Sequence, residues 1–355
     1  MPISTLYLVL SGLLWGTGGV IGTLFGRAAG LSAMSVASYR LLSGGGLIVA
    51  FLTLRGRRWP TGRAAWTRIA VNGLLSALFQ GCYFAAISLT SVSLATLVTI
   101  GATPVIVGIV EQARGRRALG RAGVITVAVA LAGLGLLAGL PGGGFSETAV
   151  LASTGMALLS AAGFAAVTLL GTSPVTGLDE LALNGFGFSL GGIALLPLAA
   201  VLGGGLSFRP SLASAGLLAA LAIGPTAVAY TLYFRGLRRA SASTAAMLTL
   251  TEPLAAAVLA ALVLGDRLSA TGIAGAVMLL AAVFRTVRAE SCNADQQGMR
   301  ATSGTEPSAP AKSGPPPGAE PAQERFQAAG HLTAVAGFVQ ALDHVATAHV
   351  TARCL

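Results

Sequence analysis

Charged side chains are scarce in this 355-residue chain. They make up 10% of its residues, against roughly 25% in an ordinary globular domain. Residues 1–288 hold only six carboxylates and 18 basic side chains. A soluble protein of this size needs polar groups over most of its surface. The scarcity therefore excludes a water-soluble body and indicates that lipid surrounds most of the chain.

Several further absences narrow the function. No histidine precedes His331, and the apolar segments hold neither paired carboxylates nor a Ser-His or Ser-Lys dyad, so an intramembrane enzyme has little support. The cysteines number three, an odd count without an extracellular pair, which argues against a structural disulfide. No glycine-rich loop carries the Lys-Ser/Thr of a phosphate loop, so neither a nucleotide cofactor nor ATP-driven transport by this chain alone is expected.

Long apolar runs are what the chain has instead. A helix needs about 20 residues to cross ~30 Å of hydrocarbon. Runs of that kind recur ten times, so the sequence predicts an all-α integral membrane protein with ten transmembrane helices. The predicted spans are residues 5–25, 32–54, 67–89, 93–112, 123–140, 151–171, 181–202, 213–234, 243–264 and 270–287.

The arginines between the spans indicate the orientation. If the N-terminus is cytoplasmic, fourteen arginines lie in the inside connections and three in the outside ones. Basic loops stay in the cytoplasm, so both termini are predicted to be cytoplasmic. The formal charge of +10 is then an orientation signal and not the mark of a nucleic-acid partner. Arginine outnumbers lysine 21 to 1, which hints at a GC-rich bacterial genome and hence the cell membrane.

The composition changes after Arg288. Residues 291–323 are rich in Pro, Ser, Gly, Ala and Gln, and such a segment buries too little apolar area to order itself. We predict that residues 289–355 form a disordered cytoplasmic tail, with room for a short helix where apolar residues return. His331, His344 and His349 lie there at spacings that match no familiar ligand set, so no metal site and no cofactor are predicted.

An internal repeat divides the apolar region. Residues 3–140 and 150–288 each contain five predicted spans, an odd number, so the second half must enter the membrane in the opposite orientation. Such inverted five-helix repeats are typical of secondary transporters that work by alternating access. The repeat is seen at a lag of 149 residues, which aligns Pro104 with Pro253, Trp15 with Phe164, and Thr103 with Glu252.

Two charged residues lie deep in the predicted spans. Glu252 is nine residues into its span, or ~14 Å, and Arg40 is eight residues into its own, or ~12 Å. A charge at mid-helix costs about 2.5 to 3.5 kcal/mol on insertion scales, so each needs an explanation. Glu252 is a candidate titratable coupling group or partner for a cationic substrate group, and Arg40 a candidate carboxylate binder. The structural alternative pairs them with each other or with backbone freed by Pro253.

Polar residues at helical spacing extend this candidate site. In lipid they should line the interior, either as a wet binding cavity or as interhelical hydrogen bonds. Trp15 is either an aromatic wall of that cavity or packing. Pro104 and Pro253 each remove a backbone donor near mid-span, and we favour a helix break that exposes polar backbone to the cavity over a packing kink. The remaining candidates are Asn72, Gln80, Tyr83, Thr103, Tyr230 and Tyr233.

Four segments carry a family resemblance. They read LLWGTGGVIGTLF, SYRLLSGGGLIVAFL, AAISLTSVSLATLVTIGATP and LTEPLAAAVLAALVLGDRLSATGIAGAVMLLAAV. With these segments the chain resembles the EamA-type drug/metabolite transporter family over nearly all of residues 5–288. The resemblance implies ten helices in two five-helix repeats, and export or exchange of small metabolites, often amino acids or related compounds.

The predicted function is therefore secondary transport, most simply export, of a small-molecule metabolite across the lipid bilayer. Proton coupling is one option, and the sequence carries no signal of oligomeric state. A passive channel or a structural membrane protein is the main alternative, although neither needs a repeat that inverts its topology. An intramembrane enzyme is the weakest alternative.

Overall fold

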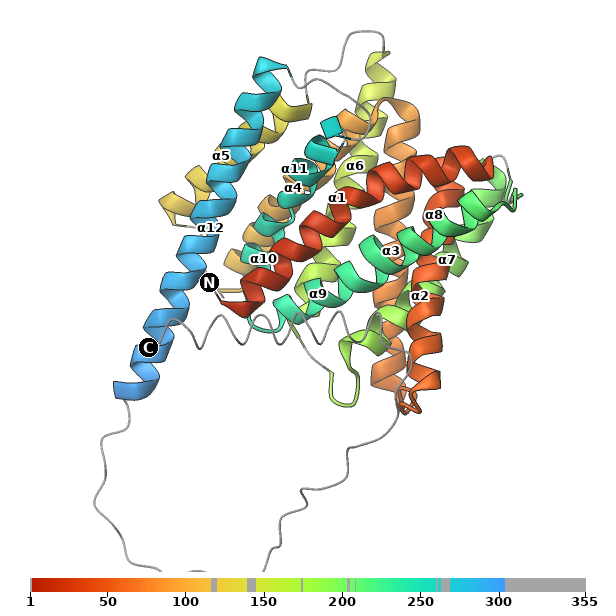
Figure 1. Cartoon of the computed structure of the whole chain (residues 1–355). Helices are drawn as coiled ribbons and strands as arrows, with labels where there is room; N and C mark the ends of the chain where they lie inside the picture. Colours follow the sequence, from red (N-terminus) through yellow and green to blue (C-terminus); the bar gives the residue numbers. More distant parts are fainter. Residues whose placement is uncertain are drawn as a thin grey trace, which may run out of the picture. The chain divides into compact units, whose positions relative to one another are not determined.

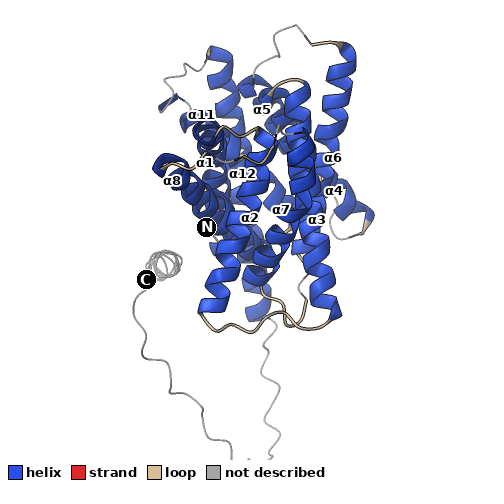
Figure 2. Ribbon diagram, turned by 90° about the vertical axis from the view of Figure 1, so that its right-hand side faces the viewer, coloured by secondary structure: helices blue, strands red, loops and turns tan. Residues whose placement is uncertain are grey.

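The computed structural model describes residues 2–115, 120–138, 145–173, 175–202, 205–207, 209–259, 261–262 and 269–303. Every regular element in these ranges is a helix (Figure 2). Ten helical segments among them are long and apolar enough to cross a membrane. The predicted all-α fold with ten spans is confirmed. The chain divides into the compact unit Met1–Ser291, described below, and the unit Cys292–Leu355.

The first five spans are single helices, and two of the last five are divided (Figure 1). Span eight consists of α8, a π-helical turn η1 and α9, and span nine consists of α10 and α11. The helices of the first half are α1 (Ile3–Ala29), α2 (Ala33–Leu54), α3 (Arg63–Leu89), α4 (Val92–Ala113) and α5 (Arg121–Ala138). Those of the second half are α6 (Glu147–Gly171), α7 (Glu180–Leu202), α8 (Leu212–Ala222), η1 (Ile223–Val228), α9 (Ala229–Leu237), α10 (Ala242–Leu248), α11 (Thr251–Leu259) and α12 (Ala270–Ser303).

Serine begins many of these helices. In six of them the N-cap serine hydroxyl accepts a hydrogen bond from the backbone N–H three residues later, which satisfies one donor that the helix itself leaves unpaired. These caps fix where the chain re-enters each span. They are Ser32, Ser91, Ser146, Ser211, Ser241 and Ser269, at the starts of α2, α4, α6, α8, α10 and α12.

The first helix of each half packs against helices of the other half. Helix α1 packs along α8, α9 and α11 of the second half, whereas α6 packs along α3 and α4 of the first (Figure 1). Helices α2 and α7 pack against each other, and α7 also packs against α3. This arrangement places α1–α4, α6, α9 and α11 around one common interior.

Glycines allow the closest helix contacts. A Cβ atom at Gly73 on α3 would lie 2.5 Å from the carbonyl oxygen of Gly187 on α7. A Cβ at Gly275 on α12 would likewise lie 2.5 Å from the carbonyl oxygen of Gly133 on α5. Without side chains at these points the backbones touch, and the helices gain close van der Waals packing, which is the main attraction between helices in lipid.

Helix α12 runs further than its predicted span. The sequence predicts that the span ends near Val287 and that the tail is disordered from residue 289, but the helix continues to Ser303. Residues 289–303 contain many good helix formers, and a helix already nucleated in the span extends through them at little cost. The rest of the predicted tail, including its three histidines, lies outside the described residues.

Candidate functional site

A small cavity lies where the two halves meet. Its volume is about 60 Å³, room for a few water molecules. Both halves contribute to its wall, α1 to α4 from the first and α6, α9 and the α10–α11 junction from the second. The lining residues are Trp15, Arg40, Phe79, Gln80, Tyr83, Thr99, Ile100, Thr103, Phe164, Tyr230, Thr249 and Glu252.

Seven of the nine predicted side chains line this cavity, namely Trp15, Arg40, Gln80, Tyr83, Thr103, Tyr230 and Glu252. Asn72 and Tyr233 do not. Asn72 is buried at the α3–α7 contact, where a Cβ at Gly187 would lie 2.9 Å from its Nδ2 atom. Helical spacing placed Asn72 on the same stripe as Gln80, but its position two turns away brings it to a different neighbour. Tyr233 lies outside the cavity lining and packs against the ring of Trp15.

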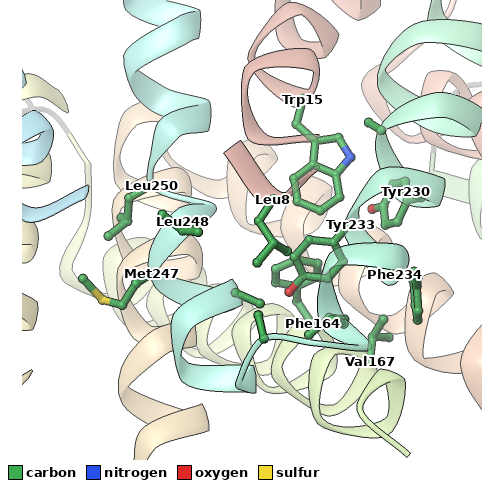
Figure 3. Packing of buried hydrophobic residues seen from close by; sticks show 14 of the residues in the cluster. Leu8, Trp15, Phe164, Val167, Tyr230, Tyr233, Phe234, Met247, Leu248 and Leu250 are labelled. Carbon is green, nitrogen blue, oxygen red and sulfur yellow. The ribbon is translucent and has the colours of Figure 1, made fainter. Parts of the chain in front are cut away.

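Aromatic rings form one side of the cavity. The ring of Trp15 on α1 lies 4.8 Å from that of Tyr230 and 4.9 Å from that of Tyr233, measured between centroids (Figure 3). Phe164, the repeat mate of Trp15, lies 5.7 Å away. The Tyr233 hydroxyl is hydrogen-bonded to Thr168 at 2.7 Å. The indole Nε1 of Trp15 is buried with no hydrogen-bond partner, so this wall offers an unused donor.

Arg40 is held by the second half of the chain and not by Glu252. Its Nε donates to the hydroxyl of Thr226 at 3.2 Å, and one terminal nitrogen donates to the carbonyl of Pro225 at 3.1 Å. Both acceptors belong to η1. The ion pairs found in the described part of the chain are Arg57–Asp179 and Arg238–Glu180, so the alternative that pairs Arg40 with Glu252 is not realised in this conformation.

Glu252 stands at the break in span nine. It occupies the first turn of α11, and α10 ends four residues earlier at Leu248. Because Pro253 has no N–H, the carbonyl of Thr249 lacks its usual helical donor. The backbone N–H of Glu252 serves that carbonyl instead, at 2.9 Å. The break thus places the carboxylate and Thr249 at the cavity wall.

The two aligned prolines have different effects. Span nine divides just before Pro253, but α4 continues as one helix through Pro104. In α4 the hydroxyl of Thr103 bonds back to the carbonyl of Thr99 at 2.8 Å, within the turn that the proline weakens. The expected helix break at the same place in both halves is therefore seen only in the second half among the described residues.

One buried carboxylate was missed by the sequence reasoning. Glu111 near the end of α4 is 7% exposed, and it accepts hydrogen bonds from the backbone N–H and the hydroxyl of Ser243 in the first turn of α10. Glu290 of α12 accepts another from Thr244 at 2.9 Å. Two carboxylates thus face the positive end of α10. The sequence pattern does not reveal this role, because Glu111 lies one residue before the end of its predicted span.

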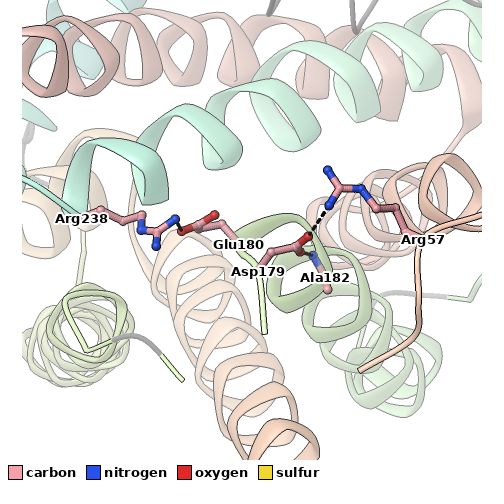
Figure 4. Close-up of polar contacts among 5 residues, drawn as sticks. All are labelled: Arg57, Asp179, Glu180, Ala182 and Arg238. Carbon is pink, nitrogen blue, oxygen red and sulfur yellow. Dashed lines mark hydrogen bonds and ion pairs between the residues drawn. The ribbon is translucent and has the colours of Figure 1, made fainter. Parts of the chain in front are cut away.

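A larger cavity opens at one end of the helices. It measures about 740 Å³ and is lined by the α2–α3 and α6–α7 connections together with Phe234 and Arg238. Exposed ion pairs cross it, with Arg57 3.8 Å from Asp179 and Arg238 2.8 Å from Glu180 (Figure 4). Because both pairs are partly exposed to solvent, each holds this mouth only weakly.

At the opposite end, partly buried hydrogen bonds join the two halves. The hydroxyl of Tyr39 donates to the carbonyl of Leu206 at 2.8 Å, and that of Ser35 donates to the carbonyl of Gly205 at 2.9 Å. The backbone N–H of Arg209 donates to the carbonyl of Ala29 at 3.1 Å. One end of the helices thus has a wide opening crossed by weak ion pairs, and at the opposite end hydrogen bonds tie the two halves together.

Comparison with known proteins now gives this architecture a family. The model of the EamA-like transporter family matches residues 2–139 and again residues 152–288. The chain belongs to the EamA-like transporter family. It is therefore a multi-pass membrane transporter, as the sequence resemblance indicated.

Individual relatives of this EamA-like transporter are consistent with the family assignment. It is 28% identical over 284 residues to the uncharacterized transporter YwfM of Bacillus subtilis (strain 168), spanning 78% of this chain and 91% of that protein. It is 30% identical over 266 residues to a WAT1-related chloroplastic protein of Arabidopsis thaliana, covering 70% of this chain but 61% of that protein. A solved structure, titled only as the crystal structure of a protein, shares the fold with a TM-score of 0.66 at 19% identity, covering 79% of this chain and 96% of the other.

Proposed function

We propose that this EamA-like transporter is a secondary exporter of small metabolites, of the amino-acid type or related to it, working by alternating access. The observation that carries the proposal is the central cavity, to which both halves of the chain contribute. One cationic side chain, Arg40, and one anionic side chain, Glu252, line it beside the rings of Trp15 and Tyr230. A solute with both charges and an apolar part would find a complement for each.

The exchange of helix partners supports alternating access. Helix α1 contacts α8, α9 and α11, and α6 contacts α3 and α4. The first span of each half thus packs against the third and fourth spans of the other half. Two inverted repeats related by a two-fold axis would make this pattern. Rocking one half against the other would then open the mouth at one end while closing the other.

The size of the cavity supports the same mechanism. At about 60 Å³ it is too small for a metabolite with several non-hydrogen atoms. A solute would enter only if the surrounding helices part. A fixed pore would instead need a continuous opening, and the hydrogen bond that ties Tyr39 to Leu206 at the far end supports a transporter that changes conformation.

The direction of transport rests on which end is open. The mouth is lined by Arg57, Arg58, Arg68 and Arg238, and the arginine distribution supports a cytoplasmic location for this end. In this conformation the protein would load from the cytoplasm, as an exporter does. Glu252 would take up a proton or the cationic group of the solute, and it would thereby couple the loaded and unloaded forms.

The proposal is tested by counterflow in liposomes. Vesicles containing the purified protein and an unlabelled metabolite mixture should accumulate a labelled member of that mixture, and Glu252→Gln should abolish the accumulation. Glu147→Gln is the matched control, because Glu147 lies in the first turn of α6, exposed and outside the cavity. Flux that does not saturate and shows no exchange would identify a channel instead.

A further inference from the structure

The π-helical turn η1 owes its shape to Pro225. Proline has no N–H for the carbonyl of Leu221, four residues earlier, and its ring crowds that carbonyl. The hydroxyl of Thr226 fills the place of the missing donor, bonding to the carbonyl of Leu221 at 2.8 Å. The N–H of Ala229 bonds to Gly224, five residues back. This shift to π-helical bonding leaves the carbonyl of Pro225 open to a donor from outside the helix.

Arg40 supplies that donor, and glycines keep the contact close. Its guanidinium bonds to both the Pro225 carbonyl and the Thr226 hydroxyl. A Cβ at Gly44, one turn further along α2, would lie 2.4 Å from a methyl carbon of Thr226. A Cβ at Gly18 on α1 would lie 3.2 Å from Pro225. Helices α1 and α2 therefore press directly on η1 beside the guanidinium.

The first half has no counterpart of this contact. At the lag of 149 residues Arg40 aligns with Ser189, whose hydroxyl bonds to Gly185 of its own helix at 2.8 Å. Pro225 aligns with Ser76, and α3 runs through that position as an uninterrupted α-helix. The α3–α7 contact is instead a close glycine contact. The polar contact between spans two and eight therefore has no equivalent between spans seven and three.

We propose that Arg40 is a latch with two alternative partners, η1 and the carboxylate of the transported solute. This inference rests on the proposed function. Arg40 lines the central cavity as well as binding η1. A carboxylate that pairs with the planar guanidinium through two hydrogen bonds makes a stronger interaction than one carbonyl and one hydroxyl. The solute would therefore draw Arg40 away from Pro225 and Thr226.

Release of the latch would free span eight to move. With its outside donor gone, η1 would lose the tie that joins it to α2, and α8 and α9 could shift relative to each other at the π-helical turn. Thr226 and the carbonyl of Pro225 act through Arg40 and are positioning groups. Solute binding would in this way be coupled to a movement that parts the halves at the far end, where Tyr39 is bonded to Leu206.

Hydrogen–deuterium exchange of the full chain in lipid nanodiscs tests the latch without solute. Arg40→Gln and Thr226→Val should raise amide exchange in residues 222–230 by roughly tenfold, the factor that corresponds to one lost charge-assisted hydrogen bond. Thr226→Ser keeps the hydroxyl and should behave like the wild type. Residues 72–80 of α3 serve as the internal reference. Wild-type exchange in both Arg40→Gln and Thr226→Val would overturn the latch, whether or not the protein transports anything.

The second arm uses a mixture of L-amino acids and, as its matched control, the corresponding decarboxylated amines. The amino acids should accelerate exchange in η1 of the wild type but not of Arg40→Gln, and the amines should leave it unchanged. An equal response to amines, or no response to the amino acids, would overturn the inference. If counterflow succeeds only with solutes that lack an anionic group, secondary transport stands, but the amino-acid type of solute and the latch both fail.

Discussion

At the scale of single residues, the deep charges are kept apart. Arg40 and Glu252 line one cavity. Arg40 donates its hydrogen bonds to η1. Among the described residues, no side chain forms a hydrogen bond or an ion pair with the Glu252 carboxylate. A directly paired Arg40 and Glu252 would satisfy each other and offer little to a solute. Their separation leaves both side chains without a mutual ion pair, as the proposed binding of a doubly charged metabolite requires.

The indole of Trp15 gives a prediction at this scale. Trp15→Phe keeps an aromatic ring in the wall but removes the unpaired Nε1 donor. If that donor binds the solute, the KM measured by counterflow should rise roughly three- to tenfold, the effect of one net hydrogen bond, while the maximal rate changes little. Trp66→Phe is the control, because Trp66 is exposed and lies outside the cavity. An unchanged KM with a lowered melting temperature would make Trp15 a packing residue.

At the scale of helices, breaks in spans eight and nine set the site. Each of the two spans contains a proline, Pro225 or Pro253, and each finds a local donor for the carbonyl that the proline leaves unserved. These replacements let the helices continue after the break at little cost. The spans of the first half, by contrast, are single helices. We therefore expect the second half to provide most of the flexible contacts and the first half most of the rigid ones.

The short helix α10 should depend on Glu111. Glu111→Gln keeps the side-chain shape but removes the charge that faces the first turn of α10 and accepts two hydrogen bonds from Ser243. We expect the free energy of unfolding, measured by denaturant titration in detergent, to fall by about 1–2 kcal/mol. Glu147→Gln, at the exposed start of α6, should leave it nearly unchanged. Equal effects of the two changes would contradict this role for Glu111.

Backbone contact between α3 and α7 gives a second prediction at this scale. Gly73→Ala would place a Cβ atom 2.5 Å from the carbonyl oxygen of Gly187, so the helices must move apart. Overpacking of this kind costs about 1–3 kcal/mol, and the midpoint of thermal unfolding should fall. Gly46→Ala on α2 is the matched control, because a Cβ there meets nothing within 4 Å. A stable Gly73→Ala protein would show that this contact is loose.

The helices were more predictable from sequence than the contacts between them. All ten spans follow from hydropathy, because each must be long and apolar whatever it touches. Arg40 and Glu252 stood out because charge in lipid is rare. The π-helical turn did not, since Pro225 signals a disturbance but not which donor will repair it. Arg40's real partners, η1 residues far along the chain, and the role of Glu111 depend on packing that local patterns do not encode.

At the scale of the unit Met1–Ser291, its two ends differ in how they are closed. The wide mouth is bridged by exposed ion pairs, each contributing less than about 1 kcal/mol, as for Arg57 with Asp179. The far end is held by partly buried bonds such as that from Tyr39 to the carbonyl of Leu206. Breaking a partly buried bond leaves an unsatisfied carbonyl and costs more. The conformation seen is therefore the one that the stronger set of contacts favours.

Access to the central cavity from the two sides of the membrane tests this account most directly. A cysteine at Thr103, in a chain whose own cysteines are replaced by serine, would be labelled with a small membrane-impermeant thiol reagent in right-side-out and inside-out vesicles. Thr103 is fully buried in the conformation seen, so the native chain should react from the cytoplasmic side, and only as the helices part there. Tyr39→Phe, which removes the hydroxyl that closes the far end, should raise labelling from outside and lower it from inside, because one population of molecules supplies both states. If outside labelling rises with no loss inside, or if both sides label together from the start, the cavity is a pore and alternating access is wrong.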